Sequence, residues 1–211
     1  MNRHYYIILA SFVLFSCIGQ HESNTQQVSM QTELTPPAVH QNADTLFLHP
    51  SQVSIHWKGT KMKGMGKHEG QIALQNGFVL LEKNRLSGGE LTIDMHTISV
   101  TDIPAHEPVP RKRLTNHLKS EEFFDVSNYP RASFHISNTT YLTADSLEIT
   151  GILEIKHIAK PIQFYAIHQG DSLSTTFTFN RFDWKIAYEG SWANKTLVDK
   201  DIELRISLSL N

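Results

Sequence analysis

The sequence predicts an all-β fold, an antiparallel eight-stranded barrel with a short helical insert over one mouth. First, apolar and polar residues alternate with a period of two through about eight or nine segments after Thr45. Second, each segment keeps one polar face, which is typical of antiparallel sheets, because parallel strands are usually apolar throughout. Third, a sheet of this size with one apolar face removes its exposed edges by closing into a barrel.

The first residues of the chain resemble the signal of a bacterial lipoprotein. Asn2–His4 is short and basic, and Tyr5–Phe15 is apolar but too short to cross a bilayer. Ser16 and Cys17 follow, as in a lipobox, where a small residue precedes a cysteine that is acylated and becomes the new N-terminus. The resemblance implies a signal peptide over residues 1–16 and an exported protein held in a membrane of the cell envelope, on the periplasmic or outer-membrane side, through acylated Cys17. The alternative is an ordinary cleaved signal with an incidental cysteine.

Residues 17–44 have the composition of a linker. Gln, Ser, Thr, Asn and Pro are frequent there, and large apolar side chains are few. Such a segment cannot bury enough apolar surface to offset the entropy lost on ordering. We therefore expect a disordered tether between the lipidated cysteine and a barrel domain over residues 45–211. An ordered, glutamine-rich arm is the alternative.

The predicted strands follow one another from Val53 to Leu210. Their inward-facing positions, in chain order, are Val53, Ile55, Trp57, Ile72, Leu74, Leu91, Ile93, Met95, Ala132, Phe134, Ile136, Leu147, Ile149, Gly151, Leu153, Ile155, Ile162, Phe164, Ala166, Leu173, Thr175, Phe177, Phe179, Ile202, Leu204, Ile206, Leu208 and Leu210. The last strand is the most regular, with Glu203 and Arg205 on its outer face. Phe78–Leu81 is apolar throughout and indicates a strand covered on both sides.

The stretch Arg111–Phe124 departs from the alternation and has helical spacing. Pro110 suits the start of a helix, and Ser120, followed by two glutamates, is typical of an N-cap. We expect one or two short helices that cover one mouth of the barrel as a lid. The lid side chains are Leu114, Leu118, Phe123 and Phe124.

Several motifs resemble the YceI-like family of lipid-binding, lipocalin-like barrels. In order they are Gly66-x-His68-x-Gly70, His117-Leu118-Lys119-Ser120, Phe123-Phe124-Asp125-Val126, Tyr129-Pro130, Phe134, Gly151-x-Leu153-x-Ile155 and Asn180-Arg181. The likeness extends over about residues 45–210. One departure is the turn at His157–Lys160, where the family usually has a glycine. The resemblance implies a barrel that binds a polyisoprenoid or another amphiphilic lipid, without an established catalytic set.

The alternation turns one side chain of every pair inward, and the resemblance implies that a long apolar or isoprenoid lipid lies among them. The expected contacts are Trp57, Leu91, Ile93, Met95, Phe134, Leu153, Phe164, Phe177 and Leu204. Burial of one five-carbon unit contributes up to roughly 4 kcal/mol, so no precise polar constellation is required. We expect the polar head of the lipid near Arg113 or Lys119. The competing interpretation is a barrel filled by its own bulky side chains, which acts as a structural or interaction lipoprotein.

Composition argues against other functions. The 19 Lys and Arg against 21 Asp and Glu give a net charge of −2, without the basic field that nucleic acid requires. None of the 12 histidines lies two or four positions from another, the spacing that favours a metal site, so neither a metal nor another cofactor is expected. Lipidation would use the one cysteine, and no Gly-x-Ser-x-Gly motif is present, so no catalytic residues are predicted. An uncharacterised enzyme is the least favoured alternative, and the oligomeric state is left open.

Overall fold

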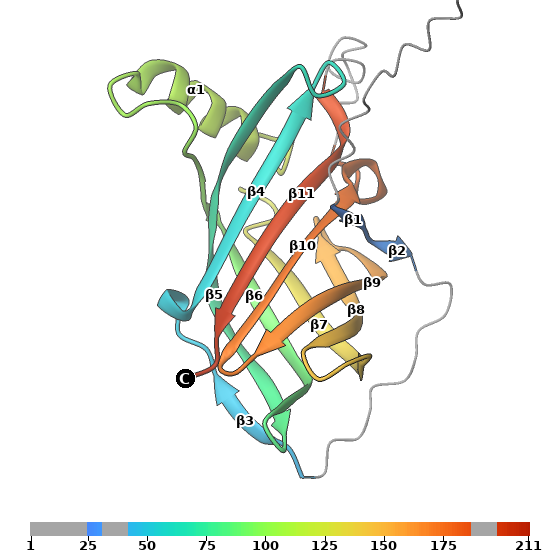
Figure 1. Ribbon diagram of the computed structural model, residues 1–211. Coiled ribbons are helices and arrows are strands. Elements are labelled where there is room, and N and C mark those ends of the chain that lie inside the picture. The colour runs from blue at the N-terminus through green and yellow to red at the C-terminus, as the bar shows by residue number, and fades with distance from the viewer. Residues whose placement is uncertain (1–24, 31–41, 187–197) are drawn as a thin grey trace, which may run out of the picture.

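The computed structural model describes residues 25–30, 42–186 and 198–211 (Figure 1). Eight strands form a closed antiparallel barrel in the order β10-β11-β4-β5-β6-β7-β8-β9, and β9 also pairs with β10. They are β4 (Val53–Lys61), β5 (Gly66–Glu82), β6 (Arg85–Val100), β7 (Arg131–Tyr141), β8 (Ser146–Ile155), β9 (Ile158–Gln169), β10 (Ser172–Asn180) and β11 (Val198–Ser209). The eight-stranded all-β barrel that the sequence predicts is confirmed.

Side-chain alternation sets the two faces of each strand. In β8 every second residue from Leu147 to Ile155 is buried, and the residues between them are partly exposed. The apolar stretch Phe78–Leu81 lies in the second half of β5. There β5 pairs with β6 on one side and with β3 (Asp44–Phe47) on the other, and η1 (Pro50–Gln52) connects β3 to β4. The buried residues thus form a large cluster inside the barrel and a smaller one, of Trp57, Ile98, Val100 and Leu118, at the end where α1 lies.

Two hairpins turn through residues other than glycine. Lys83 and Asn84 connect β5 to β6, and Lys156 and His157 connect β8 to β9, all four with positive φ. Two successive left-handed residues give the turn whose twist matches that of the flanking strands. The second turn is where the sequence departs from the family pattern. Contacts hold it there: Lys156 Nζ donates to the carbonyl of Phe123 at 3.2 Å, and the His157 ring lies edge-on to Tyr129.

The structure has one α-helix in its described part, α1 (Pro108–Lys119), between β6 and β7. It begins at Pro108 rather than after Pro110, and Ser120 is its C-cap rather than the N-cap of a second helix. The Ser120 hydroxyl donates to the carbonyl of His117 at 2.8 Å, so it satisfies an acceptor at a helix end. The prediction of a helix start at Ser120 is therefore wrong, and residues 121–124 form turns.

A short N-terminal segment completes the barrel wall. Strands β9 and β10 pair directly only at Ser172–Ser174 with Ile167–Gln169. Beyond that point, β1 (Gln26–Gln27) pairs in parallel with β10, and β2 (Ser29–Met30) pairs with β9. We call residues 25–30 the seam segment. A disordered tether over residues 17–44 is therefore wrong for these six residues and for Asp44, which begins β3, whereas residues 17–24 and 31–41 lie outside the described residues.

Side chains as well as backbone hold the seam segment. The Gln26 side chain donates to the carbonyl of Tyr165 and accepts from its N–H, both at 2.7 Å. Val28 is buried in the core, and its N–H donates to the carbonyl of Thr178. Thr25 donates its hydroxyl to Glu203, which is buried, whereas the sequence placed Glu203 on an open outer face.

Candidate functional site

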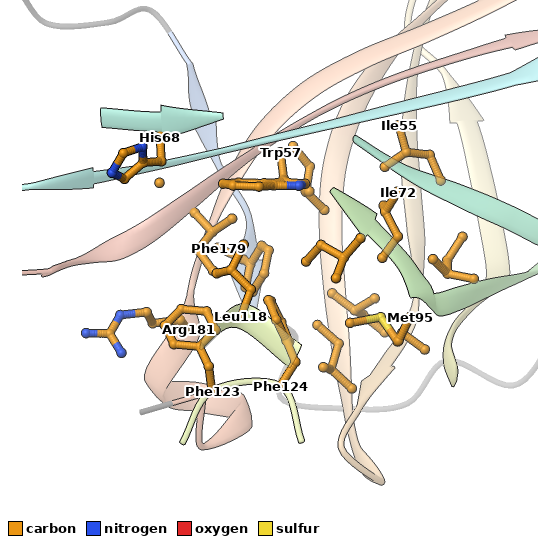
Figure 2. A pocket seen from close by; sticks show the side chains of 18 of the residues that line it. Ile55, Trp57, His68, Ile72, Met95, Leu118, Phe123, Phe124, Phe179 and Arg181 are labelled. Atoms are coloured by element: carbon orange, nitrogen blue, oxygen red, sulfur yellow. The ribbon is translucent and has the colours of Figure 1, made fainter. Parts of the chain in front are cut away.

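A cavity of about 210 Å³ lies inside the barrel, and Figure 2 shows part of its wall. Side chains from every barrel strand line it, and their alternation explains why the wall is apolar along most of its length. An eight-stranded barrel has room either for packed side chains or for one small ligand. This one retains a cavity, which reaches one mouth of the barrel, formed in the described residues by the end of β4, η2 (Arg181–Trp184) and the start of β11.

The structure brings together at one cavity the nine side chains that were expected to contact a lipid and the four that were expected to form the lid. The interior residues that line the cavity are Trp57, Leu91, Ile93, Met95, Phe134, Leu153, Phe164, Phe177 and Leu204. The lid residues that line it are Leu114, Leu118, Phe123 and Phe124. Ile55, Ile72, Ile155, Ile162, Phe179, Ile202 and Ile206 also contribute.

An aromatic cluster narrows the middle of the cavity. The rings of Phe134 and Phe164 lie 5.5 Å apart, and Phe164 stacks on Phe177 at 4.5 Å with an interplanar angle of 26°. Such pairs are stabilised beyond the burial of their surface. The phenylalanines therefore fill part of the barrel but not all of it.

The lid differs from the prediction in extent. Figure 1 shows α1 directed away from the barrel, and among its residues only Leu118 is buried. Closure comes from Leu118 and from the turn that follows the helix. Phe123 and Phe124 lie there edge to face at 5.0 Å. Trp57 belongs to the same cluster as these three residues and faces them across the pocket in Figure 2.

Polar side chains gather at one end of the cavity, and sequence analysis missed them. They are Thr60, Lys61, Lys67, His68, Arg181 and Asp199. His68 Nδ1 lies 2.9 Å from a carboxylate oxygen of Asp102. Arg113 and Lys119, where we expected the polar head of a lipid, do not line the cavity. Arg181 already belonged to a quoted motif, but no periodicity marks it as inward-facing.

Arg181 is buried at this mouth and serves the fold. Its guanidinium donates to the carbonyls of Ile186 at 2.6 Å and of Val198 and Asp199 at 3.1 Å. Burial lowers the pKa of Arg181, and the nearby Asp199 carboxylate opposes this. Because three of its donors already have carbonyl acceptors, the guanidinium fixes the end of β10 against β11.

Asp199 holds the β4–β5 turn at the same mouth. It accepts hydrogen bonds from the Thr60 hydroxyl at 2.6 Å and from the N–H groups of Lys63 and Gly64 at 3.0 Å. Burial acts to raise its pKa, but these donors and Arg181 outweigh it, so the pKa of Asp199 lies below its usual value. The carboxylate is therefore ionised at neutral pH and ties β11 to the turn.

The described residues include no group of three or more His, Cys, Asp and Glu that could hold a metal ion. No helix in the described ranges is both long and apolar enough to cross a membrane. The chemistry that the cavity supports is the burial of an apolar molecule against an apolar wall, with charged groups confined to the mouth.

Comparisons with known proteins fit this architecture. Residues 47–210 match the model of a family described as the YceI-like domain. Two UPF0312 proteins, from two strains of Pseudomonas putida, are each 27% identical over 126 residues, which are 54% of this chain and 60% of the relative. The chain thus spans about three fifths of the length of these curated relatives.

Solved structures resemble the barrel as well. BcnA from Burkholderia cenocepacia superposes with a TM-score of 0.60 at 16% identity, over 76% of this chain and 98% of BcnA. A YceI protein from Campylobacter jejuni gives a TM-score of 0.48 at 15% identity, over 95% and 96% of the two chains. The likeness to BcnA shows a shared fold.

Proposed function

This chain belongs to the YceI-like domain family, and from that membership and the cavity we propose that it binds a long apolar or isoprenoid lipid inside its barrel. The single observation that carries the proposal is an apolar cavity inside the barrel, with the lid residues and the polar side chains together at its mouth. Each methylene group moved from water into such a cavity contributes about 0.8 kcal/mol. Affinity then needs no network of polar contacts, and we propose no catalytic role.

The size of the cavity limits how the lipid lies. Pockets for drug-sized ligands measure roughly 300–1,000 Å³, and this cavity measures about 210 Å³. A short apolar segment fits as the wall stands. A longer chain would either extend through the mouth or displace flexible side chains such as Met95. The polar head would then lie by Lys61 and Lys67 rather than by Arg113 or Lys119.

Lipidation at Cys17 would place this binding protein at a membrane of the cell envelope. We propose this from the basic start, the apolar stretch and the Ser16–Cys17 junction of the sequence. Two or more acyl chains anchor a protein stably, whereas one gives only marginal binding. The signal and Cys17 lie outside the described residues.

The test is to identify the lipid that the protein carries. The protein would be purified from its native host without added lipid, extracted with organic solvent and measured by mass spectrometry. It would also be incubated with vesicles that contain a fluorescent prenol, and transfer to the protein would be followed. We expect co-purified apolar lipid and saturable transfer. Purified protein that contains no lipid and takes up no prenol would support the filled-barrel alternative.

Two substitutions connect binding to the cavity. Met95→Trp adds volume without charge, so it should shorten or exclude the bound chain while the domain remains folded. Leu153→Lys puts an unpaired charge in the apolar wall and should abolish retention. Arg205→Ala is the matched control, because Arg205 is exposed on the outer face of β11. If Arg205→Ala lost as much lipid as Met95→Trp, the loss would not depend on the side chains that line the cavity.

A further inference from the structure

The turn between β4 and β5 exposes apolar and basic side chains together. We call residues 61–67 the tip loop. Its two methionines, Met62 and Met65, are 45% and 78% exposed. Lys61, Lys63 and Lys67 are exposed between and beside them. Exposed apolar side chains that are bordered by polar ones are typical of surfaces that contact a protein or a membrane.

The tip loop is held in this form by the rest of the barrel. Met62 and Lys63 both have left-handed φ angles, of 55° and 57°, and Gly64 follows with 84°. Asp199 accepts hydrogen bonds from the N–H groups of Lys63 and Gly64, so a carboxylate on β11 fixes the loop backbone. The methionines are therefore presented to solvent by a braced turn.

The tip loop borders the mouth of the cavity. Lys61 and Lys67 both line the cavity, and in Figure 1 the turn lies at the same end of the barrel as α1. Val109, at the start of α1, is 76% exposed, and Lys112 and Arg113 follow it. The opposite end of the barrel carries β3. Exposed apolar and basic groups thus recur around the mouth.

Acidic groups also face this end and reduce its positive charge. Glu69 pairs with Lys67 at 3.2 Å, and Asp102 pairs with His68. Lys61 and Lys63 stand beside the two methionines on the loop itself. Basic side chains next to exposed apolar ones complement the headgroups and acyl chains of an anionic bilayer.

We propose that the tip loop docks on an anionic lipid bilayer, with Met62 and Met65 among the headgroups and Lys61 and Lys63 against lipid phosphates. Docking in this orientation turns the cavity mouth toward the membrane. It is a contact separate from any acyl chain on Cys17, and it does not depend on what the cavity binds.

The test places one fluorophore on the loop. The full chain has a single cysteine, so Cys17→Ser removes both the predicted acylation site and the competing thiol. Met65→Cys in that background is then labelled with an environment-sensitive dye. Phe47→Cys is the matched control, since Phe47 is 76% exposed on β3 at the other end of the barrel. Each protein is mixed with vesicles of phosphatidylcholine, with or without phosphatidylglycerol.

We expect a blue shift, and quenching by lipid-borne quenchers, for the dye at position 65 with phosphatidylglycerol vesicles, and neither effect at position 47. Adding Lys61→Gln and Lys63→Gln should weaken partitioning roughly 25-fold, since each basic group near an anionic surface contributes about fivefold. Equal changes at both positions, or a change that is indifferent to phosphatidylglycerol, would overturn the proposal. Unchanged fluorescence of the dye at position 65 would also overturn the proposal, and a protein partner would then be the candidate for binding Met62 and Met65. Prenol uptake measured on the same samples separates this outcome from a failure of lipid binding.

Discussion

Phe164 and Phe177, from β9 and β10, stack in the middle of the barrel with ring centroids 4.5 Å apart. Both rings line the cavity, and both residues are buried. Phe177→Ala should therefore lower the free energy of unfolding by about 3–5 kcal/mol. It should also enlarge the cavity, so that longer apolar chains are retained. Urea unfolding measures the first effect, and the chain length of bound prenols measures the second. If Phe177→Ala is destabilised but still binds prenols of the same chain length, the stacked rings stabilise the fold and do not limit the ligand.

Gly70 in β5 lies against the backbone of β6. A Cβ added there would lie 1.8 Å from the carbonyl oxygen of Ser99 and 2.6 Å from Cζ2 of Trp57. Gly70→Ala should lower the free energy of unfolding by about 3 kcal/mol or more, because the carbonyl oxygen of Ser99 belongs to the backbone and cannot move aside. Gly59→Ala is the control, since nothing lies within 4 Å of its added Cβ. Equal unfolding midpoints for the two variants would contradict this close packing.

Asp199 should make the stability of the barrel depend on pH. Its pKa is lowered in the folded state, so its contribution is fully present above the unfolded pKa, near 3.8, and is lost as the pH falls through the lower folded value. Asp199→Asn should therefore lower the free energy of unfolding by about 1–3 kcal/mol at pH 7. The difference from the natural chain should shrink below about pH 4.

The control for Asp199 is Asp171→Asn. Asp171 is exposed in the β9–β10 turn, and the substitution makes the same change in net charge. Denaturant unfolding of the three proteins across the acidic range checks the prediction. Suppose that the difference in unfolding free energy between the natural chain and Asp199→Asn does not change down to the lowest pH measured. That result would show that the hydrogen-bond geometry of Asp199, and not its ionisation, stabilises the fold.

Cys17 is predicted to be the acylated mature N-terminus. Cys17→Ala should release the protein from membranes or stall its processing, because no thiol remains to carry the acyl chains. Fractionation of cells followed by detection of the protein in each fraction makes the measurement. A variant that is processed and fractionates with membranes like the natural protein would favour the ordinary cleaved signal.

The alternation of the sequence was enough to predict the barrel and the wall of its cavity. Once a strand has a buried face, a shift of one residue would turn every side chain outward, so the apolar pattern determines which residues meet inside. Leu153 and Leu204 are far apart in the sequence, but each lies on the apolar face of its own strand and reaches the same cavity.

The polar mouth and the seam segment could not be predicted in this way. Asp199 acts on Lys63 from more than a hundred residues away, and neither residue belongs to a recognisable motif. The strands β1 and β2 have two residues each, too few to show any periodicity. Glu203 alternates as an outer residue should, but it is buried there, where Thr25 of the seam segment and Lys58 both donate to its carboxylate.

The seam segment has a mechanical consequence. It opposes Phe177 on one side and Ile162 on the other, and both of these residues line the cavity. Thr25 follows Cys17 by eight positions, a length that spans at most about 29 Å. Tension applied to the chain ahead of Thr25 is therefore borne by the pairings of the seam segment with β10 and β9, together with the side-chain hydrogen bonds of Thr25 and Gln26. Such a pull therefore reaches the side wall of the cavity directly, through β10 and β9.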